Sequence, residues 1–312
     1  MTEARETIGF IGLGLMGHGM AKNIVEKGYA LSVTAHRNRA PVDDLVARGA
    51  TEAASPKEVA ERSSIVFICV TGSPEVEAVV RGENGLAKGL KSGSCVVDCS
   101  TADPTSTVRL AEELAASGVD FADAPLSRTP KEAWEGTLDT MVGASDAVFE
   151  RIRPVLDTWA GKVVHIGAVG DGHRMKLLNN FISLGYAAIY AEALALAQKV
   201  GISPERFDSV IRGGRMDCGF YQTFMGYTIE GNRESHKFTL VNALKDTTYL
   251  ESMADAAGLV NPVGNAVKNS FAGAVAGGGG GAEDYVPHLP VYVGRANGID
   301  LAPVKSKEGD KS

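Results

Sequence analysis

Three glycines follow a short apolar run close to the start of the chain. Residues 7–11 form that run, and Gly12, Gly14 and Gly17 come directly after it, before a predicted helix and a second apolar run. The order strand, G-x-G-x-x-G, helix, strand is typical of a βαβ unit that binds a dinucleotide. The glycines permit a tight turn and a close approach to a pyrophosphate, which sits on free N–H groups at the helix N-terminus. We expect the three glycines and Leu15 to contact a cofactor, rather than to form a turn without a ligand.

The second strand, predicted over 29–35, ends in basic rather than acidic residues. Sites that prefer NAD usually have a carboxylate here for the ribose hydroxyls, whereas this chain has Arg37 and Asn38. An Arg at this point can hold a 2′-phosphate through charge-assisted hydrogen bonds. The sequence therefore favours NADP (NADPH), with NAD possible. A solvated basic loop is the alternative, and it would leave the choice of cofactor open.

Strands and helices alternate over the first half of the chain and then give way to helices. Continuous apolar runs are typical of central parallel strands. Such runs or shorter strand patterns predict strands over 65–70, 94–98, 119–122, 138–142 and 163–166. Helical spacing without clear strands follows over 204–211, 220–229, 240–258 and 263–276. We predict an NADP-binding domain of doubly wound α/β type over 1–168, a helical domain over 201–303, and a disordered charged tail over 304–312.

The stretch between these domains, 169–200, is predicted to be one helix. It is apolar on almost every side, which is typical of a buried helix. Lys176 lies three and four residues before Asn179 and Asn180, so the three project from one side. Lys176 is a candidate proton donor, because the pKa of a buried Lys falls readily. The helix alone favours the alternative, a Lys with its stem packed and its head in water.

Composition and charge narrow the class of protein. The chain has 312 residues with 44% hydrophobic and 22% charged content, as in an ordinary soluble globular protein, and its formal net charge of -7 argues against nucleic acid. It has no uninterrupted apolar run of ~18 residues and no signal-like start, so we predict no membrane span. The four cysteines form no C-x-x-C pair, which indicates reduced thiols and a cytoplasmic protein. The histidine spacing predicts no metal site.

Four motifs in order resemble the β-hydroxyacid dehydrogenase family, which includes 3-hydroxyisobutyrate dehydrogenases and tartronate and succinic semialdehyde reductases. They are residues 9–17, 123–127 and 172–180 and the pair Lys245-Asp246, and the resemblance extends to about Asn297. It implies a Rossmann-like N-terminal domain, a long interdomain helix and an all-α C-terminal domain. It also implies a homodimer or homotetramer.

The resemblance also implies roles for individual residues. It makes Lys176 the catalytic acid/base, which reverses the preference drawn from the helix alone, and makes Asn180 a substrate contact, with Asn179 beside it. Lys245 would lie near nicotinamide and substrate. The residues expected to line the cofactor are Met16, Val70, Thr71 and Thr101.

One motif departs from the family. The family usually has Ser-Gly-Gly where this chain has Ser127, Arg128 and Thr129. The Arg-Thr pair resembles sulfolactaldehyde reductases, in which a sulfonate replaces the substrate carboxylate. Since Arg carries a full charge and up to five donors, we expect these three residues to hold the anionic end of a substrate. The alternative is that Arg128 points to solvent or to an acid such as Glu132.

The predicted reaction is reversible hydride transfer between the nicotinamide and the carbonyl carbon of a short anionic semialdehyde. Lys176 would donate a proton to the carbonyl oxygen and accept it in the reverse direction. Two alternatives remain. One is an imine reductase, although such relatives generally lack the Lys. The other is a sensor that binds NADPH without turnover.

Overall fold

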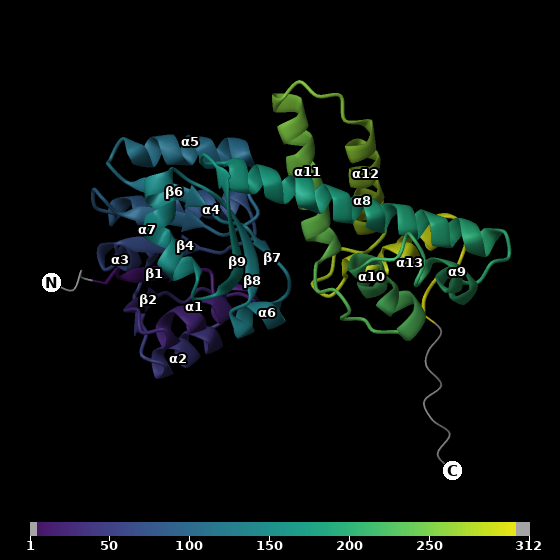
Figure 1. Cartoon of the computed structure of the whole chain (residues 1–312), viewed down its shortest axis with the longest axis horizontal. Helices are drawn as coiled ribbons and strands as arrows, with labels where there is room; N and C mark the ends of the chain where they lie inside the picture. The colour runs from purple at the N-terminus through teal and green to yellow at the C-terminus, as the bar shows by residue number, and fades with distance from the viewer. Residues whose placement is uncertain (1–4, 304–312) are drawn as a thin grey trace, which may run out of the picture. The chain divides into compact units, whose positions relative to one another are not determined.

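The computed structural model describes residues 5–303. The chain divides into two compact units, Met1–Lys176 and Leu177–Ser312 (Figure 1). The division falls inside the long helix α8, Asp171–Lys199. The tail predicted to be disordered, 304–312, lies outside the described residues.

The first unit is built on one nine-stranded sheet with the order β3-β2-β1-β4-β5-β6-β8-β7, in which β9 also pairs with β8. The strands are β1 Ile8–Ile11, β2 Leu31–Val33, β3 Thr51–Glu52, β4 Ile65–Ile68, β5 Cys95–Asp98, β6 Asp120–Asp123, β7 Leu126–Ser127, β8 Leu138–Gly143 and β9 Ala160–Gly167. Pairing is parallel from β3 through β6, while β8 runs antiparallel to β6 and β7 and parallel to β9.

Helices cover both faces of this sheet. They are α1 Gly17–Glu26, α2 Ala40–Ala47, α3 Pro56–Glu61, α4 Ser73–Arg81, α5 Pro104–Ala115, α6 Pro130–Glu135 and α7 Asp146–Leu156. Successive residues of β4 alternate between two hydrophobic clusters, with Phe67 in one and Val66 and Ile68 in the other. Because successive side chains of a strand point to opposite faces, the sheet has a core on each side. This confirms the predicted Rossmann-like fold of the first half.

The second unit is helical, as predicted. It contains the rest of α8 with α9 Pro204–Ile211, α10 Gly219–Glu230, α11 Leu240–Ala256, α12 Pro262–Ala276 and α13 Leu289–Ala296. The sequence did not indicate α13, or β3, β7, α2, α4 and α6 in the first unit. Each is at most nine residues long, which is too short for a periodic pattern to be distinct.

The prediction that α8 is buried on every side is only partly right. Leu184, Ala187 and Leu194 belong to the core of the second unit. Ile182 and Ile189, in contrast, are 58% and 61% exposed. Among the described residues, α8 is long and apolar enough to cross a membrane by length and composition alone, and 50% of that window is buried. The core helix of a globular protein has the same properties.

Candidate functional site

The glycine turn after β1 is shaped by close backbone packing. Gly12 has a φ of 95°, and a β-carbon there would lie 2.1 Å from the carbonyl oxygen of Cys69. A β-carbon on Gly17 would lie 2.0 Å from the carbonyl oxygen of Gly12. Gly14 is exposed, and among the described residues no atom beyond Gly14 and its two chain neighbours lies within 4 Å of its β-carbon position. Two glycines are therefore required by the fold, and the third leaves the turn open to an approaching ligand.

The start of α1 fits an anionic group. Its N-cap residue is Met16, which makes no side-chain capping bond, and Leu15 before it is 71% exposed. The first N–H groups of a helix have no partner within the helix, and the helix dipole favours negative charge there. The residues at this turn thus fit the pyrophosphate of a dinucleotide.

The ends of β1, β4 and β5 lie next to one another. Ile11 pairs with Ile68, and Ile68 pairs with Asp98. The predicted cofactor residues Val70, Thr71 and Thr101 follow these strand ends, and the amide of Val70 donates to Ser100 Oγ at 3.0 Å. The structure therefore brings these residues and the glycine turn to the carboxyl edge of one sheet, where ligands of such folds bind.

The basic loop after β2 contains two arginines in different situations. Arg39 makes two hydrogen bonds to Glu52, at 2.9 and 2.7 Å, and also lies 3.2 Å from Asp43. Arg37 and Asn38 are exposed, and Asn38 Oδ1 accepts a hydrogen bond from the amide of Ala40. Arg37 is thus better placed than Arg39 to meet a phosphate.

The predicted substrate turn contains an unusual backbone conformation. Arg128 has a φ of 87°, and among the described residues it is the only non-glycine residue with a positive φ. Its Nε lies 3.0 Å from Asp139 Oδ2, and its side chain is 49% exposed. The acid that Arg128 contacts is therefore Asp139, whereas the sequence had suggested Glu132 as the alternative partner. Ser127 pairs with Asp139 across β7 and β8.

Thr129 serves as the N-cap of α6. Its hydroxyl accepts from the amide of Lys131 at 3.3 Å, and its own amide donates to Glu132 Oε2 at 3.0 Å, forming a capping box. The Thr129 hydroxyl also donates to Glu132 and holds the pKa of that carboxyl below its usual range. A substrate anion would have to compete with Glu132 for both donors.

A buried polar cluster, which the sequence did not indicate, anchors the beginning of α8. Asp123 Oδ1 accepts from the amide of Gly170 at 2.6 Å, and Oδ2 accepts from the amide of His173 at 2.7 Å. The His173 ring contacts Thr107 Oγ1 at 2.8 Å and the carbonyl oxygen of Ser100 at 3.1 Å. Burial raises the pKa of Asp123.

This cluster positions the predicted proton donor. Lys176 follows His173 by three residues on the same helix and is half-buried. Asp123 ends β6, so its hydrogen bonds tie the first turn of α8 to the sheet edge that carries the glycine turn. Asp123 was part of the family motif, but its partners lie 47 and 50 residues further along the chain. A carboxylate at the end of a buried strand was the only local signal.

Asn180 and Lys245 share one buried carboxylate in the second unit. Asn180 Nδ2 donates to Asp246 Oδ2 at 2.6 Å, and Lys245 Nζ lies 3.2 Å from Asp246 Oδ1. Asn180 is 6% exposed, whereas the neighbouring Asn179 is exposed. A carboxylate only accepts hydrogen bonds, so the amide nitrogen of Asn180 must face it, and Asn180 Oδ1 is left as an acceptor.

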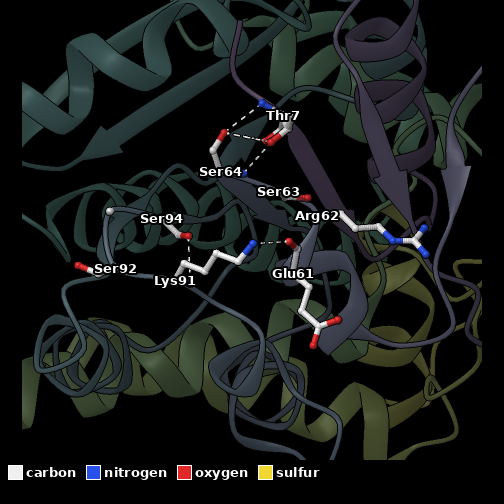
Figure 2. Close-up of a pocket in the computed structure, with 9 residues that line it drawn as sticks. Thr7, Glu61, Arg62, Ser63, Ser64, Lys91, Ser92 and Ser94 are labelled. Atoms are coloured by element: carbon white, nitrogen blue, oxygen red, sulfur yellow. Dashed lines mark hydrogen bonds between the residues drawn. The ribbon is translucent and has the colours of Figure 1, made fainter. Parts of the chain in front are cut away.

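A separate pocket of about 270 Å³ lies at the amino ends of β1, β4 and β5, and Figure 2 shows the residues that line it. Its polar groups bond to one another: Lys91 Nζ donates to the carbonyl oxygen of Glu61 at 3.0 Å, and Thr7 and Ser64 exchange hydrogen bonds. It contains none of the predicted site residues. Within residues 5–303, no group of three or more His, Cys, Asp or Glu side chains could hold a metal ion.

Known proteins resemble the chain over both units. Residues 7–167 match the NAD binding domain of 6-phosphogluconate dehydrogenase, and residues 170–290 match the NAD-binding domain of NADP-dependent 3-hydroxyisobutyrate dehydrogenase. A 2-(hydroxymethyl)glutarate dehydrogenase from Eubacterium barkeri is 40% identical over 65% of this chain and 67% of the relative. A 3-sulfolactaldehyde reductase from Escherichia coli is 32% identical over 88% of this chain and 91% of the relative. The solved structure of Mycobacterium tuberculosis 3-hydroxyisobutyrate dehydrogenase with L-serine has a TM-score of 0.80 and 27% identity, covering 91% of this chain and 99% of that chain.

Proposed function

Because the chain belongs to the β-hydroxyacid dehydrogenase family, we propose that it interconverts short anionic semialdehydes and the corresponding hydroxyacids or hydroxysulfonates, with NADPH as the preferred cofactor. One observation carries this proposal. The hydrogen bonds of Asp123 fasten the turn of α8 that precedes Lys176 to the sheet edge bearing the glycine turn. Lys176, the proposed proton donor, and the glycine turn, the proposed nucleotide site, thus belong to the same edge of one unit.

The bound nicotinamide would supply and accept the hydride. In reduction, a hydride reaches the carbonyl carbon while Lys176 gives a proton to the carbonyl oxygen, which becomes the hydroxyl group. In oxidation, Lys176 takes that proton back. The buried contacts of Asp123 and His173 restrict how far Lys176 can move, which favours a productive geometry.

Asn180 would act both as a donor and as an acceptor. One N–H of its amide nitrogen faces Asp246, which leaves Oδ1 as an acceptor and the second N–H as a donor. Oδ1 would accept from the substrate hydroxyl in oxidation, and the second N–H would donate to the negatively charged oxygen that develops during reduction. Lys245 and Asn179 would contribute at the cofactor and substrate.

The anionic end of the substrate would be held by Ser127 and Arg128, with Thr129 closing the turn beneath it. Arg128 is half exposed and carries donors beyond the one that faces Asp139. The 2′-phosphate of NADPH would meet Arg37. Imine reduction fits less well, because Lys176 provides a proton donor suited to a carbonyl oxygen.

The test is loss of NADPH absorbance with a panel of short aldehydes that carry a carboxylate or a sulfonate. We expect turnover with at least one of them, and a loss of about a hundredfold to ten-thousandfold in kcat for Lys176→Ala. Lys199→Ala, at the other end of α8, is the matched control and keeps wild-type turnover. Activity of Lys176→Ala within about tenfold of wild type would remove Lys176 as the acid. Tight NADPH binding without any turnover would favour the sensor.

The protein would act in the cytoplasm as a homodimer or homotetramer. The exposed side of α8 supports an assembly, because Leu178, Ile182, Tyr186, Ile189 and Leu196 recur at spacings of three, four and seven residues. Sedimentation should show a species of two or four chains, and Ile189→Asp should shift it to smaller species. A wild-type monomer at micromolar concentration would contradict the assembly.

A further inference from the structure

The direction of the Arg128 side chain depends on its backbone conformation. Ser127 and Asp139 are directly paired on β7 and β8, so their side chains share one face of the sheet. In an extended strand the next residue, Arg128, would point to the other face. Its φ of 87° is instead in the left-handed region, and its guanidinium contacts Asp139. A strained backbone thus places Arg128 on the face of Ser127.

Asp139 has one carboxylate oxygen that contacts Arg128 and a second one that is buried. Its side chain is 30% exposed, and its second oxygen, Oδ1, is buried with no hydrogen-bond partner among residues 5–303. Arg128 contacts Asp139 through Nε, and the guanidinium has N–H groups on both Nη atoms as further donors. A fork of this kind binds an oxyanion through two parallel hydrogen bonds.

The positive charge of Arg128 is already offset by acidic side chains before any substrate binds. Arg128 contributes one positive charge and Asp139 one negative charge at 3.0 Å, and the carboxylate of Glu132 also acts on Arg128. A singly charged carboxylate or sulfonate can bind such a site through hydrogen bonds without a large excess of negative charge. A doubly charged phosphonate would bring a second negative charge near Asp139.

We infer that Asp139 sets the charge preference of this enzyme for its substrates: it makes the Arg128 site favour singly charged anions over doubly charged ones. This rests on the proposed function, since it assumes that the anion of the semialdehyde binds at Arg128. Asp139 touches Arg128 rather than the reacting atoms, so it is a positioning residue that sets specificity.

The test compares the kcat/KM values of three two- or three-carbon aldehydes that bear a carboxylate, a sulfonate or a phosphonate, above the second pKa of the phosphonate. In wild type we expect the phosphonate to be at least about tenfold poorer than the sulfonate. Asp139→Asn keeps the size and an acceptor for Arg128 Nε but removes the charge. It should raise the phosphonate-to-sulfonate ratio about tenfold, mainly through KM. Glu135→Gln, an exposed acid on α6 paired with Lys131, is the control and leaves the ratio unchanged.

The outcomes separate the two proposals. If wild type reduces the carboxylate or sulfonate but Asp139→Asn leaves the ratio within twofold, the charge-selection role is wrong and the proposed function stands. If wild type reduces none of the aldehydes, both the proposed function and the charge-selection role of Asp139 are wrong.

A second measurement on the unaltered protein does not depend on the folding of a variant. Methylphosphonate should inhibit more weakly above its second pKa than below it, while methanesulfonate, whose charge is constant, reports any other effect of pH. Equal inhibition by the singly and doubly charged forms would overturn the inference.

Discussion

Two turns at the carboxyl edge of the sheet use the same backbone conformation for different purposes. Gly12, after β1, has a φ of 95°, and Arg128, after β7, has a φ of 87°. At Gly12 the carbonyl group of Cys69 occupies the place of a β-carbon, so no side chain fits. At Arg128 a long charged side chain is present and is held by Asp139.

The two turns therefore differ in what determines their residue: close packing requires a glycine at position 12, whereas the proposed binding of an anion requires a charged side chain at position 128. A glycine position can offer only its backbone, and backbone N–H groups suit the pyrophosphate shared by all dinucleotides. A turn that carries Arg128 offers a charge, which selects among substrates. We therefore expect changes in the glycine turn to damage the fold and cofactor binding together, and changes in the substrate turn to alter specificity while the fold persists.

The largest effect is expected for Gly12→Ala, which forces a β-carbon against the Cys69 carbonyl oxygen and strains a left-handed backbone. The free energy of unfolding should fall by about 3 kcal/mol or more, and NADPH affinity by at least about a hundredfold. Urea denaturation and NADPH fluorescence titration measure both. Gly14→Ala is the matched control and should change stability by less than about 0.5 kcal/mol, because the space beside Gly14 is open within the described chain. Equal losses in the free energy of unfolding for the two variants would contradict the packing argument.

The next effect concerns Arg128. Both Arg128→Gly and Arg128→Ala should lower kcat/KM for an anionic semialdehyde by about a hundredfold, because a charge-assisted contact is lost. The glycine variant should be more stable than the alanine variant by about 1 kcal/mol, since only glycine adopts the left-handed backbone without strain. Thermal unfolding compares the pair. An alanine variant as stable as the glycine variant would show that this backbone is not strained.

Arg37 is the charged contact that we propose for the cofactor. Arg37→Asp should weaken NADPH binding about thirtyfold and leave NADH within about threefold, because only NADPH carries the 2′-phosphate. Arg39→Ala, which removes the partner of Glu52, should affect both cofactors equally. Equal losses of affinity for NADPH and NADH in Arg37→Asp would contradict the assignment of Arg37 to the 2′-phosphate.

The smallest effect is expected at Thr129. Thr129→Ala removes the N-cap of α6 and should lower the free energy of unfolding by about 1 kcal/mol. Since the hydroxyl is bonded to Glu132, kcat/KM should fall less than about threefold. Chemical denaturation and steady-state kinetics measure the two quantities. A loss of kcat/KM beyond tenfold without a change in stability would place the Thr129 hydroxyl directly on the substrate.

The sequence predicted features that depend on neighbours in the chain. The apolar runs of β4 and β5, the glycine turn and the helix bearing Lys176 all carry their signal within a few residues. It could not predict that Arg128 contacts Asp139, because that contact depends on the left-handed backbone of Arg128 and on the pairing of the two-residue strand β7 with β8. The contact between Asn180 and Asp246 spans 66 residues and requires the folded helices.

Transfer of deuterium from C4-deuterated NADPH tests the central claim most directly. The cofactor labelled on each face of C4 in turn is incubated with the preferred semialdehyde, and the product is analysed by mass spectrometry. The proposed hydride transfer predicts a hydroxyacid or hydroxysulfonate one mass unit heavier with one of the two labelled forms. NADPH consumption with no label in the product from either form would contradict it.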